Sequence, residues 1–383
     1  MVRLRRFTNR LLLVAALLLL AQITRAEAQH SFATAIQRFE NQVAADVTAD
    51  GVGSIVAAVM VGNSVMWARA FGWSDGDRQM PAGVETIYRT GSISKTFTAV
   101  LLMQLVERGV VALDDPVVKH LPEFAELNGP EEQVLSITLR QLASHTGGLI
   151  REPELPLAAS GPLAEWESKV VASIPTTSLQ SEPGTEYSYS NIGFGILGLS
   201  ISRAAGKSFM ELVTELIFEP LGMTQSTFAL TPLLEPYMAV GYAVGEDGSI
   251  DAEYPAREHA GRGYKVPNGG VYSTVGDLAR FAAALSGASP HTIISARARR
   301  EMLTIQTPED TTRGYGLGLS IRTTDDGVRL VGHGGSVSGY NAHMVFDPET
   351  KIGVILLRNY GRGNTNLGRA AQGLAAELAE MKR

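Results

Sequence analysis

The sequence contains no cysteine among its 383 residues. This absence excludes a thiol nucleophile, a disulfide framework, a lipid-attachment cysteine and any metal site built on thiolate ligands. Stability must therefore come from the hydrophobic core, which a chain of this length can supply. The histidines also never occur in the His-x-x-x-His spacing typical of a helical zinc site. We therefore expect neither a metal nor a cofactor.

The chain also lacks an excess of positive charge. Its 33 Lys and Arg residues are outnumbered by 39 Asp and Glu residues, which gives a formal net charge of −6 at pH 7. Proteins that bind nucleic acid present basic patches to the phosphate backbone, so this balance argues against a nucleic-acid partner. We find no internal repeat and no low-complexity segment.

Long hydrophobic runs are scarce as well. The apolar run over residues 11–21 is shorter than the roughly 20 residues that a membrane-spanning helix needs. It follows four arginines and precedes Ala26-Glu27-Ala28, a small-x-small cleavage site, so the segment predicts a secretory signal peptide over residues 1–28. Cleavage would remove five arginines and one glutamate, which changes the formal charge from −6 to −10. We expect a secreted or periplasmic bacterial protein without a stable membrane anchor, with an uncleaved anchor as the alternative.

Residue periodicity predicts strands near both ends of the chain and helices between them. An amphipathic helix over residues 32–43 is followed by strands over 54–61 and 64–71, joined by a tight Gly62-Asn63 turn. Near the other end, a helix over 275–285 precedes the remaining predicted elements, which are strands over 316–322, 328–332, 342–347 and 353–358 and a helix over 367–381. Residues 113–267 are mostly helical in pattern.

This order predicts an α/β (α+β) fold. A mostly antiparallel sheet formed by both chain ends is flanked by helices, and an all-helical lobe is inserted between the two ends. The predicted boundaries are a signal peptide over 1–28 and one domain over 29–383, with an α/β part over about 29–112 and 268–383 and a helical lobe over about 113–267.

The candidate nucleophile is Ser92, because an apolar segment over residues 99–106 follows it and predicts a buried helix. Ser92 falls at the start of this helix, and Lys95 lies three residues later on the same face. A serine hydroxyl needs a neighbouring base before it can attack a carbonyl, and a lysine in apolar surroundings loses its proton more readily. Only Lys95, of seven lysines, has a serine three positions before it. The alternative is that a serine caps the helix while Lys95 reaches solvent.

Two further polar segments carry candidate site residues. In residues 183–191, a tyrosine beside an ammonium group can have its pKa lowered and act as a base, which makes Tyr189 a candidate. Asn191 can hold a substrate amide as donor and acceptor together. The alternative for this segment is an ordinary tight loop with a buried tyrosine.

The other segment is His333-Gly334-Gly335-Ser336, at the end of the predicted strand over 328–332. Small residues there let a substrate approach backbone N–H groups that can bind an oxyanion. His333 can donate to a substrate carboxylate or carbonyl. The alternative is a glycine-rich strand edge with a structural histidine.

The order Ser92-x-x-Lys95, Tyr189-x-Asn191 and His333-x-Gly335 resembles that of the serine β-lactamase and penicillin-binding protein superfamily. The likeness is greatest to the branch that holds class C β-lactamases, S12-type D,D-carboxypeptidases, D-aminopeptidases and family VIII carboxylesterases. It extends over roughly residues 32–380, and three more segments carry it: 113–117 (LDDPV), 142–149 (LASHTGGL) and 269–281 (GGVYSTVGDLARF).

The resemblance implies a role for each candidate residue. Ser92 would attack a carbonyl and become acylated, while Lys95 and Tyr189 share the role of base and Tyr189 later activates water. Asn191 would bind the substrate amide or orient Lys95. The backbone N–H groups of Ser92 and Ser336 would hold the oxyanion, with Gly334 and Gly335 beside them. The resemblance also makes His145 structural.

One departure from the family pattern concerns substrate choice. Class C β-lactamases carry Lys-Thr-Gly where this chain has His333-Gly334-Gly335, and histidine is largely neutral at pH 7 whereas lysine is a permanent cation. The resemblance therefore implies a secreted serine hydrolase that forms an acyl-enzyme with an amide or ester, of D,D-peptidase or β-lactamase-like type. The alternatives are a carboxylesterase and a non-catalytic protein that binds penicillin or peptidoglycan. The expected partner is a small-molecule or peptide substrate, and the expected state is a monomer or small homo-oligomer.

Overall fold

The computed structural model describes residues 31–259, 261–307, 310 and 312–383. The predicted signal peptide, residues 1–28, therefore lies outside the described residues. Within them, no helix combines the length and the apolar composition that crossing a membrane requires.

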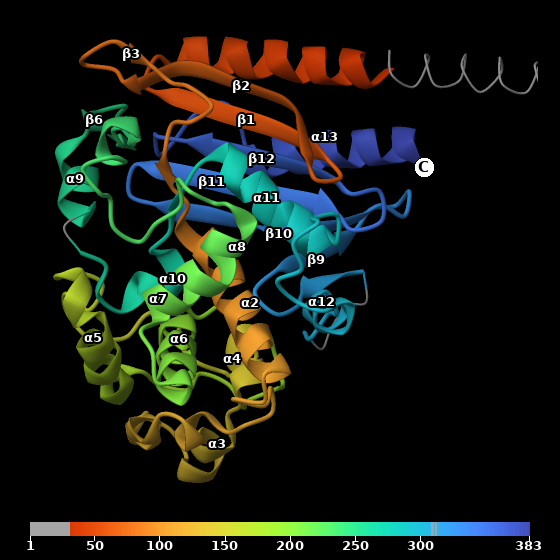
Figure 1. Cartoon of the computed structure of the whole chain (residues 1–383). Coiled ribbons are helices and arrows are strands. Elements are labelled where there is room, and N and C mark those ends of the chain that lie inside the picture. The colour runs from red at the N-terminus through yellow and green to blue at the C-terminus, as the bar shows by residue number, and fades with distance from the viewer. Residues whose placement is uncertain (1–30, 260, 308–309, 311) are drawn as a thin grey trace, which may run out of the picture.

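An antiparallel sheet of eight strands forms the upper layer of the molecule in Figure 1. Its strand order is β3-β2-β1-β12-β11-β10-β9-β8. The bounds are β1 Ser54–Val61, β2 Ser64–Asp75, β3 Met80–Pro81, β8 Arg313–Tyr315, β9 Ser320–Thr323, β10 Arg329–Val337, β11 Tyr340–Asp347 and β12 Ile352–Arg358. Because β1 pairs with β12 over seven residue pairs, segments from both ends of the chain meet inside the sheet, as predicted.

Helices cover both faces of this sheet. On one face lie the helix over residues 31–50 and α13 (Leu367–Lys382), whose apolar side chains share a core with β1 and β12. On the other face, α2 (Ser94–Glu107) and α11 (Val275–Ser286) pack in a second core that continues into the helical layer. Strands β1 and β12 are buried almost throughout, which explains their continuous apolar sequences.

The remaining helices form the lower layer in Figure 1 and the connections to the sheet. They are α3 Glu131–Ser136, α4 Leu139–Ala143, α5 Trp166–Ser173, α6 Asn191–Ala205, α7 Phe209–Val213, α8 Glu219–Leu221, α9 Glu253–His259, α10 Val266–Gly269 and α12 Ala296–Met302. Helix α6 runs through the centre of this layer: Ser190 caps its first turn through a bond from Gly193 N, and Gly206 ends it at φ +65°.

The region between residues 113 and 267 departs from an all-helical composition in one place. Strands β5 (Ala243–Val244) and β6 (Ile250–Asp251) pair around a turn at Gly248, whose φ is +81°. Two-residue strands are too short to leave an alternating pattern in the sequence, so periodicity gave no sign of them. A second small ribbon pairs β4 (Tyr88–Arg89), just before the Ser92 segment, with β7 (Tyr272–Ser273).

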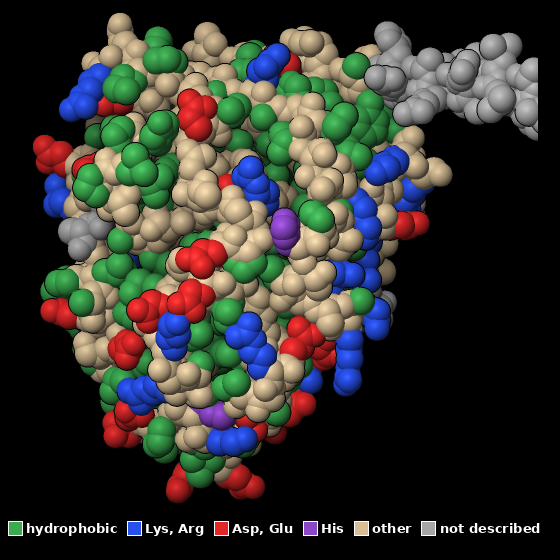
Figure 2. Space-filling model, in the orientation of Figure 1, with side chains coloured by type: hydrophobic (Ala, Val, Ile, Leu, Met, Phe, Trp, Pro, Cys, Tyr) green, Lys and Arg blue, Asp and Glu red, His purple; other side chains and the backbone are tan. Residues whose placement is uncertain are grey.

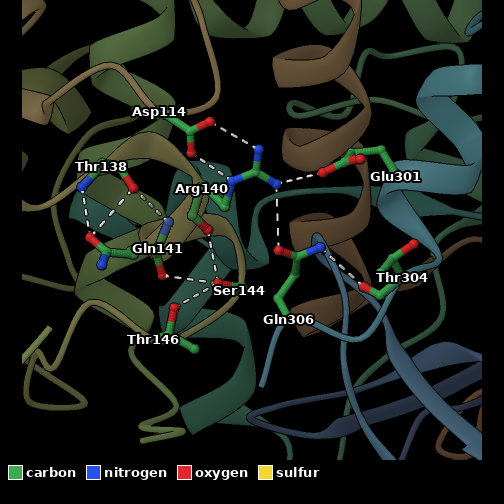
Figure 3. A network of polar contacts seen from close by, with 9 residues as sticks. All are labelled: Asp114, Thr138, Arg140, Gln141, Ser144, Thr146, Glu301, Thr304 and Gln306. Atoms are coloured by element: carbon green, nitrogen blue, oxygen red, sulfur yellow. Dashed lines mark hydrogen bonds and ion pairs between the residues drawn. The ribbon is translucent and has the colours of Figure 1, made fainter. Parts of the chain in front are cut away.

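A polar network ties the helical layer to the edge of the sheet (Figure 3). Arg140 on α4 donates to Asp114 Oδ1 at 2.7 Å and to Glu301 Oε1 on α12 at 2.5 Å. Its Nη1 atom also lies 3.4 Å from Gln306 Oε1, in the loop that leads to β8. Arg140 thereby links three segments that are far apart in the sequence.

Charged side chains of both signs are interspersed over the helical layer on the face shown in Figure 2. The helical layer on this face therefore carries charges of both signs close to one another.

Candidate active site

Ser92 lies in a short turn of 3₁₀ helix, Gly91–Ile93, directly before α2. Neither this turn nor α2 has a side-chain cap, so the interpretation of Ser92 as a capping residue is wrong. Ser94 instead accepts a hydrogen bond from Val271 N at 3.1 Å. The Ser92 hydroxyl is left partly exposed beside a cavity.

Lys95 is completely buried, so the alternative in which it reaches solvent is wrong. Its Nζ atom lies 3.0 Å from Ser92 Oγ, 2.7 Å from Asn191 Oδ1 and 3.3 Å from the carbonyl oxygen of Asn268. Burial holds the pKa of Lys95 well below its ordinary value, and the positive charge of Arg151 lowers it further.

The neighbours of Lys95 orient its lone pair. The carbonyl oxygens of Asn191 and Asn268 can only accept hydrogen bonds, so they take the two N–H groups of a neutral amine. The remaining lone pair of Nζ then faces the Ser92 hydroxyl. This arrangement can remove a proton from Ser92 without first discharging a buried ammonium group.

Tyr189 lines the larger cavity at Ser92 and lies close enough to the Ser92 side chain for that group to influence its pKa. The prediction that its pKa is lowered is wrong: burial raises the pKa of Tyr189 to about 12, against the opposing effect of the Ser92 side chain. Lys95 Nζ lies 4.8 Å from the centroid of the tyrosine ring, so the amine faces the ring. Tyr189 is therefore a proton donor at neutral pH.

A histidine supports Tyr189 from behind. His145 is buried, and its ring centroid lies 4.2 Å from that of Tyr189. Its Nδ1 atom accepts a hydrogen bond from Ser190 N at 3.1 Å, and burial lowers its pKa well below the ordinary value. His145 thus packs as a neutral ring against the segment that carries Tyr189.

Asn191, the first residue of α6, joins Lys95 to a carboxylate that the sequence analysis missed. Its Nδ2 atom donates to Glu152 Oε1 at 2.5 Å, and the same carboxylate accepts from Tyr264 and lies 3.4 Å from Lys265 Nζ. A second missed residue is Asn268, whose carbonyl accepts from Lys95 and whose side chain donates to Asn191 O at 2.8 Å. Glu152 follows segment 142–149 and Asn268 precedes segment 269–281, so proximity to these two segments was the available signal.

The backbone of Gly334, Gly335 and Ser336 lies against the Ser92 turn. A side chain at Gly335 would come within 1.9 Å of Thr90 O and 3.0 Å of Ser92 N, so only glycine permits this approach. Gly91, at φ +53°, faces Ser336 N in the same way. The backbone nitrogen atoms of Ser92 and Ser336 therefore lie close to this contact between the two segments.

His333 is buried and bonded within the protein rather than facing either cavity at Ser92. It lies inside β10 and not at a strand end, because pairing with β11 continues to Val337. Gly334 O, 2.5 Å from Nδ1, can only accept, so Nδ1 carries the proton and Nε2 accepts from the Tyr315 hydroxyl at 2.8 Å. Burial lowers the pKa of His333 to about 3, which keeps the ring neutral.

Two cavities meet at Ser92. The smaller, about 170 Å³, is lined on its inner side by Asn191 and Asn268. The larger, about 560 Å³, is lined by Tyr189 and by residues 334–336. His333 is not among the described residues that line either cavity. Across the described part of the chain, no group of three or more His, Asp and Glu side chains is placed to hold a metal ion.

Comparisons with known proteins identify the family of the chain. A family model described as Beta-lactamase matches residues 39–379. Beta-lactamase-like protein 2 of Dictyostelium discoideum is 27% identical over 314 residues, which is 80% of this chain and 56% of that protein. D-alanyl-D-alanine-carboxypeptidase/endopeptidase AmpH of Escherichia coli K12 is 30% identical over 233 residues, which is 60% of this chain and 57% of AmpH. The chain thus spans little more than half the length of either relative.

Two solved structures share the fold. An octameric penicillin-binding protein homologue from Pyrococcus abyssi gives a TM-score of 0.70 at 27% identity and covers 85% of this chain and 73% of its own. A D-stereospecific amidohydrolase from Streptomyces sp. gives 0.69 at 26% identity and covers 90% and 97%. Because the family model spans most of the sequence, this chain belongs to the beta-lactamase family, whose members are serine hydrolases of the β-lactamase and penicillin-binding protein superfamily.

Proposed function

We propose that this protein is a secreted serine hydrolase in which Ser92 attacks an amide or ester carbonyl and carries the acyl group until water releases it. The observation that supports this most directly is the complete burial of Lys95 at 3.0 Å from Ser92 Oγ. A buried lysine whose pKa is lowered is the neutral base that a serine nucleophile needs. We further propose one catalytic domain over residues 29–383, with the lobe over about 113–267 supplying one side of the site.

In this proposal Lys95 takes the proton of Ser92 as the hydroxyl oxygen bonds to the carbonyl carbon. The negative charge that develops on the carbonyl oxygen is held by the N–H groups of Ser92 and Ser336. Tyr189, protonated at neutral pH, donates to the leaving group as the C–N or C–O bond breaks. It then accepts a proton from the water that attacks the acyl-enzyme, and Lys95 returns its proton to Ser92 Oγ as the bond to the acyl group breaks.

The neutral state of His333 bears on the type of substrate. A permanent cation at the third motif would bind the carboxylate of a β-lactam, and His333 supplies none because its pKa is about 3. This observation favours substrates whose leaving half needs no such cation, either peptide-like amides or simple esters. Carboxylesterase activity is therefore the second candidate function.

The test is a comparison of the unaltered chain with Ser92→Ala and with a control, Ser168→Ala, at an exposed serine on α5. Each protein is incubated with a fluorescent penicillin, D-Ala-D-Ala peptides and p-nitrophenyl acetate, and mass spectrometry locates the acyl adduct. We expect an adduct on the peptide containing Ser92 and loss of turnover in Ser92→Ala alone.

The substrate panel separates the alternatives. Turnover of p-nitrophenyl acetate without turnover of amides would identify an esterase. Labelling without turnover of any substrate would identify a binding protein. Equal turnover by Ser92→Ala and the unaltered chain would refute Ser92 as nucleophile.

A further inference from the structure

Two buried arginines face the smaller cavity at Ser92. Arg89 lies on β4 and Arg262 follows α9, and their exposed fractions are 3% and 4%. They reach the cavity from segments more than 170 positions apart in the sequence. The proposed mechanism uses neither of them.

The protein itself leaves the positive charge of these arginines incompletely paired. Among the described residues that line the cavity, Glu258 supplies the one carboxylate, and its Oε2 atom lies 3.4 Å from Arg89 Nη1. Arg89 Nε is buried without a hydrogen-bond partner. Arg262 donates to neutral acceptors, the hydroxyl of Tyr272 at 2.6 Å and the carbonyl oxygen of Glu258 at 3.2 Å.

A buried guanidinium group without a matching anion is costly, because desolvation of the charge is not offset by an ion pair. Lys265, which also lines the cavity, adds a third cation, although Glu152 lies 3.4 Å from it. The wall of the cavity is therefore suited to an anion supplied from outside the chain. A planar carboxylate fits the fork of an arginine side chain well.

The position of Tyr189 indicates which half of a substrate enters this cavity. Tyr189 lines the larger cavity, so a leaving group that takes its proton must lie on that side of Ser92. The acyl half then extends the opposite way, past Asn191 and Asn268 into the smaller cavity. A volume of about 170 Å³ admits a compact substituent close to the reacting carbonyl.

We propose that Arg89 and Arg262 form a subsite for a carboxylate on the acyl half of the substrate, so that the preferred acyl donors carry a negative charge close to the scissile carbonyl. This inference rests on the proposed acyl-enzyme function, since it defines the acyl half by the position of Tyr189. It names the class of substrate that the hydrolase accepts.

The experiment compares two penicillins that differ in one group of the acyl side chain. Carbenicillin carries a carboxylate where benzylpenicillin carries hydrogen. Acylation rates are measured by competition with a fluorescent penicillin, and equilibrium binding to Ser92→Ala is measured by calorimetry, which needs no reaction. We expect carbenicillin to be favoured about tenfold or more in both measurements, the size of one hydrogen bond to a charged group.

Variants locate the preference. Arg262→Ala should reduce the ratio to about one, whereas Arg257→Ala, an exposed arginine on α9 outside this cavity, should leave it unchanged. Glu258→Gln should raise the ratio, because it removes the carboxylate that competes for Arg89. Binding of benzylpenicillin shows whether Arg262→Ala is folded. If it is not, Glu258→Gln still tests the subsite, because Glu258 is partly exposed and its replacement disturbs the fold less.

The outcomes separate this inference from the proposed function. The subsite is refuted if carbenicillin and benzylpenicillin give equal acylation rates and equal binding affinities. It is also refuted if the preference for carbenicillin survives Arg262→Ala and does not rise in Glu258→Gln. A binding preference without acylation of the unaltered chain supports the subsite and refutes the acyl-enzyme.

Discussion

The base that activates Ser92 can be identified from the pH dependence of acylation. Tyr189 has a pKa of about 12, so at pH 7 its deprotonation costs five pH units, or about 7 kcal/mol at about 1.36 kcal/mol per unit. Lys95 has a pKa well below its ordinary value because burial disfavours the ammonium form, so its deprotonation costs less than that of Tyr189. The proposed mechanism therefore assigns the role of base at neutral pH to Lys95, which contacts Ser92.

The acylation rate constant should therefore rise with pH as Lys95 loses its proton, with a midpoint below 10.5. The assay is stopped-flow labelling by a fluorescent penicillin from pH 5 to pH 10. Tyr189→Phe should lower the plateau by about 10²- to 10⁴-fold, the usual contribution of an acid or base, while the midpoint stays in place. Tyr187→Phe, at the neighbouring and more exposed tyrosine, is the control and should change neither quantity.

The opposite pattern would refute this reasoning. If the acid limb disappears in Tyr189→Phe and persists in Lys95→Met, then the tyrosine is the base and the burial of Lys95 serves another purpose.

Three further predictions concern the surroundings of Ser92 and the stability of the fold. Gly335→Ala should reduce the acylation rate by at least about 10²-fold, because the new Cβ would lie 1.9 Å from Thr90 O. The control is Gly373→Ala, at a position on α13 with open space around it. This variant should keep full activity and gain up to about 1 kcal/mol of helix stability. Glu152→Gln should move the acid limb of the acylation profile to lower pH, because the Glu152 charge raises the pKa of Lys95; a shift to higher pH would contradict this. Arg140→Ala should lower the free energy of unfolding in urea by about 1 kcal/mol, an effect reduced by salt, whereas Arg78→Ala, at a largely exposed ion pair, should have almost no effect.

Most of the sheet could be predicted because its central strands are buried on both faces. The continuous apolar residues of β1 and β12 predicted buried strands, and the Gly62-Asn63 turn predicted the first hairpin. The predicted strand over 316–322 is wrong over its first four residues. There Gly316 and Gly318, the latter at φ +68°, form the turn between β8 and β9.

The part of the site that could be predicted is formed by residues that lie close together in the sequence. Ser92 and Lys95 are one helical turn apart, so their contact follows from sequence spacing alone. The pKa of Tyr189 did not follow, because it depends on burial by the aromatic rings of other segments and not on the charge of Lys95. Glu152 and Asn268 reach Asn191 and Lys95 through tertiary packing, which no local pattern encodes.

The pairing of β1 with β12 has a consequence for when the proposed site can assemble during synthesis of the chain. Ser92, Lys95 and Tyr189 are all synthesised before residue 190, yet Ser336 belongs to a strand connected to β1 only through β11 and β12. A nascent chain that has not yet emerged beyond residue 358 cannot close the sheet, so under the proposed mechanism it would present Ser92 without Ser336 held in place beside it. Such long-range pairing is slow to form, because the entropy of closing a loop of some 300 residues must be lost first. If the proposed function is right, hydrolytic activity should arise late in folding, and a partly synthesised chain should be inert toward the ester and amide bonds around it.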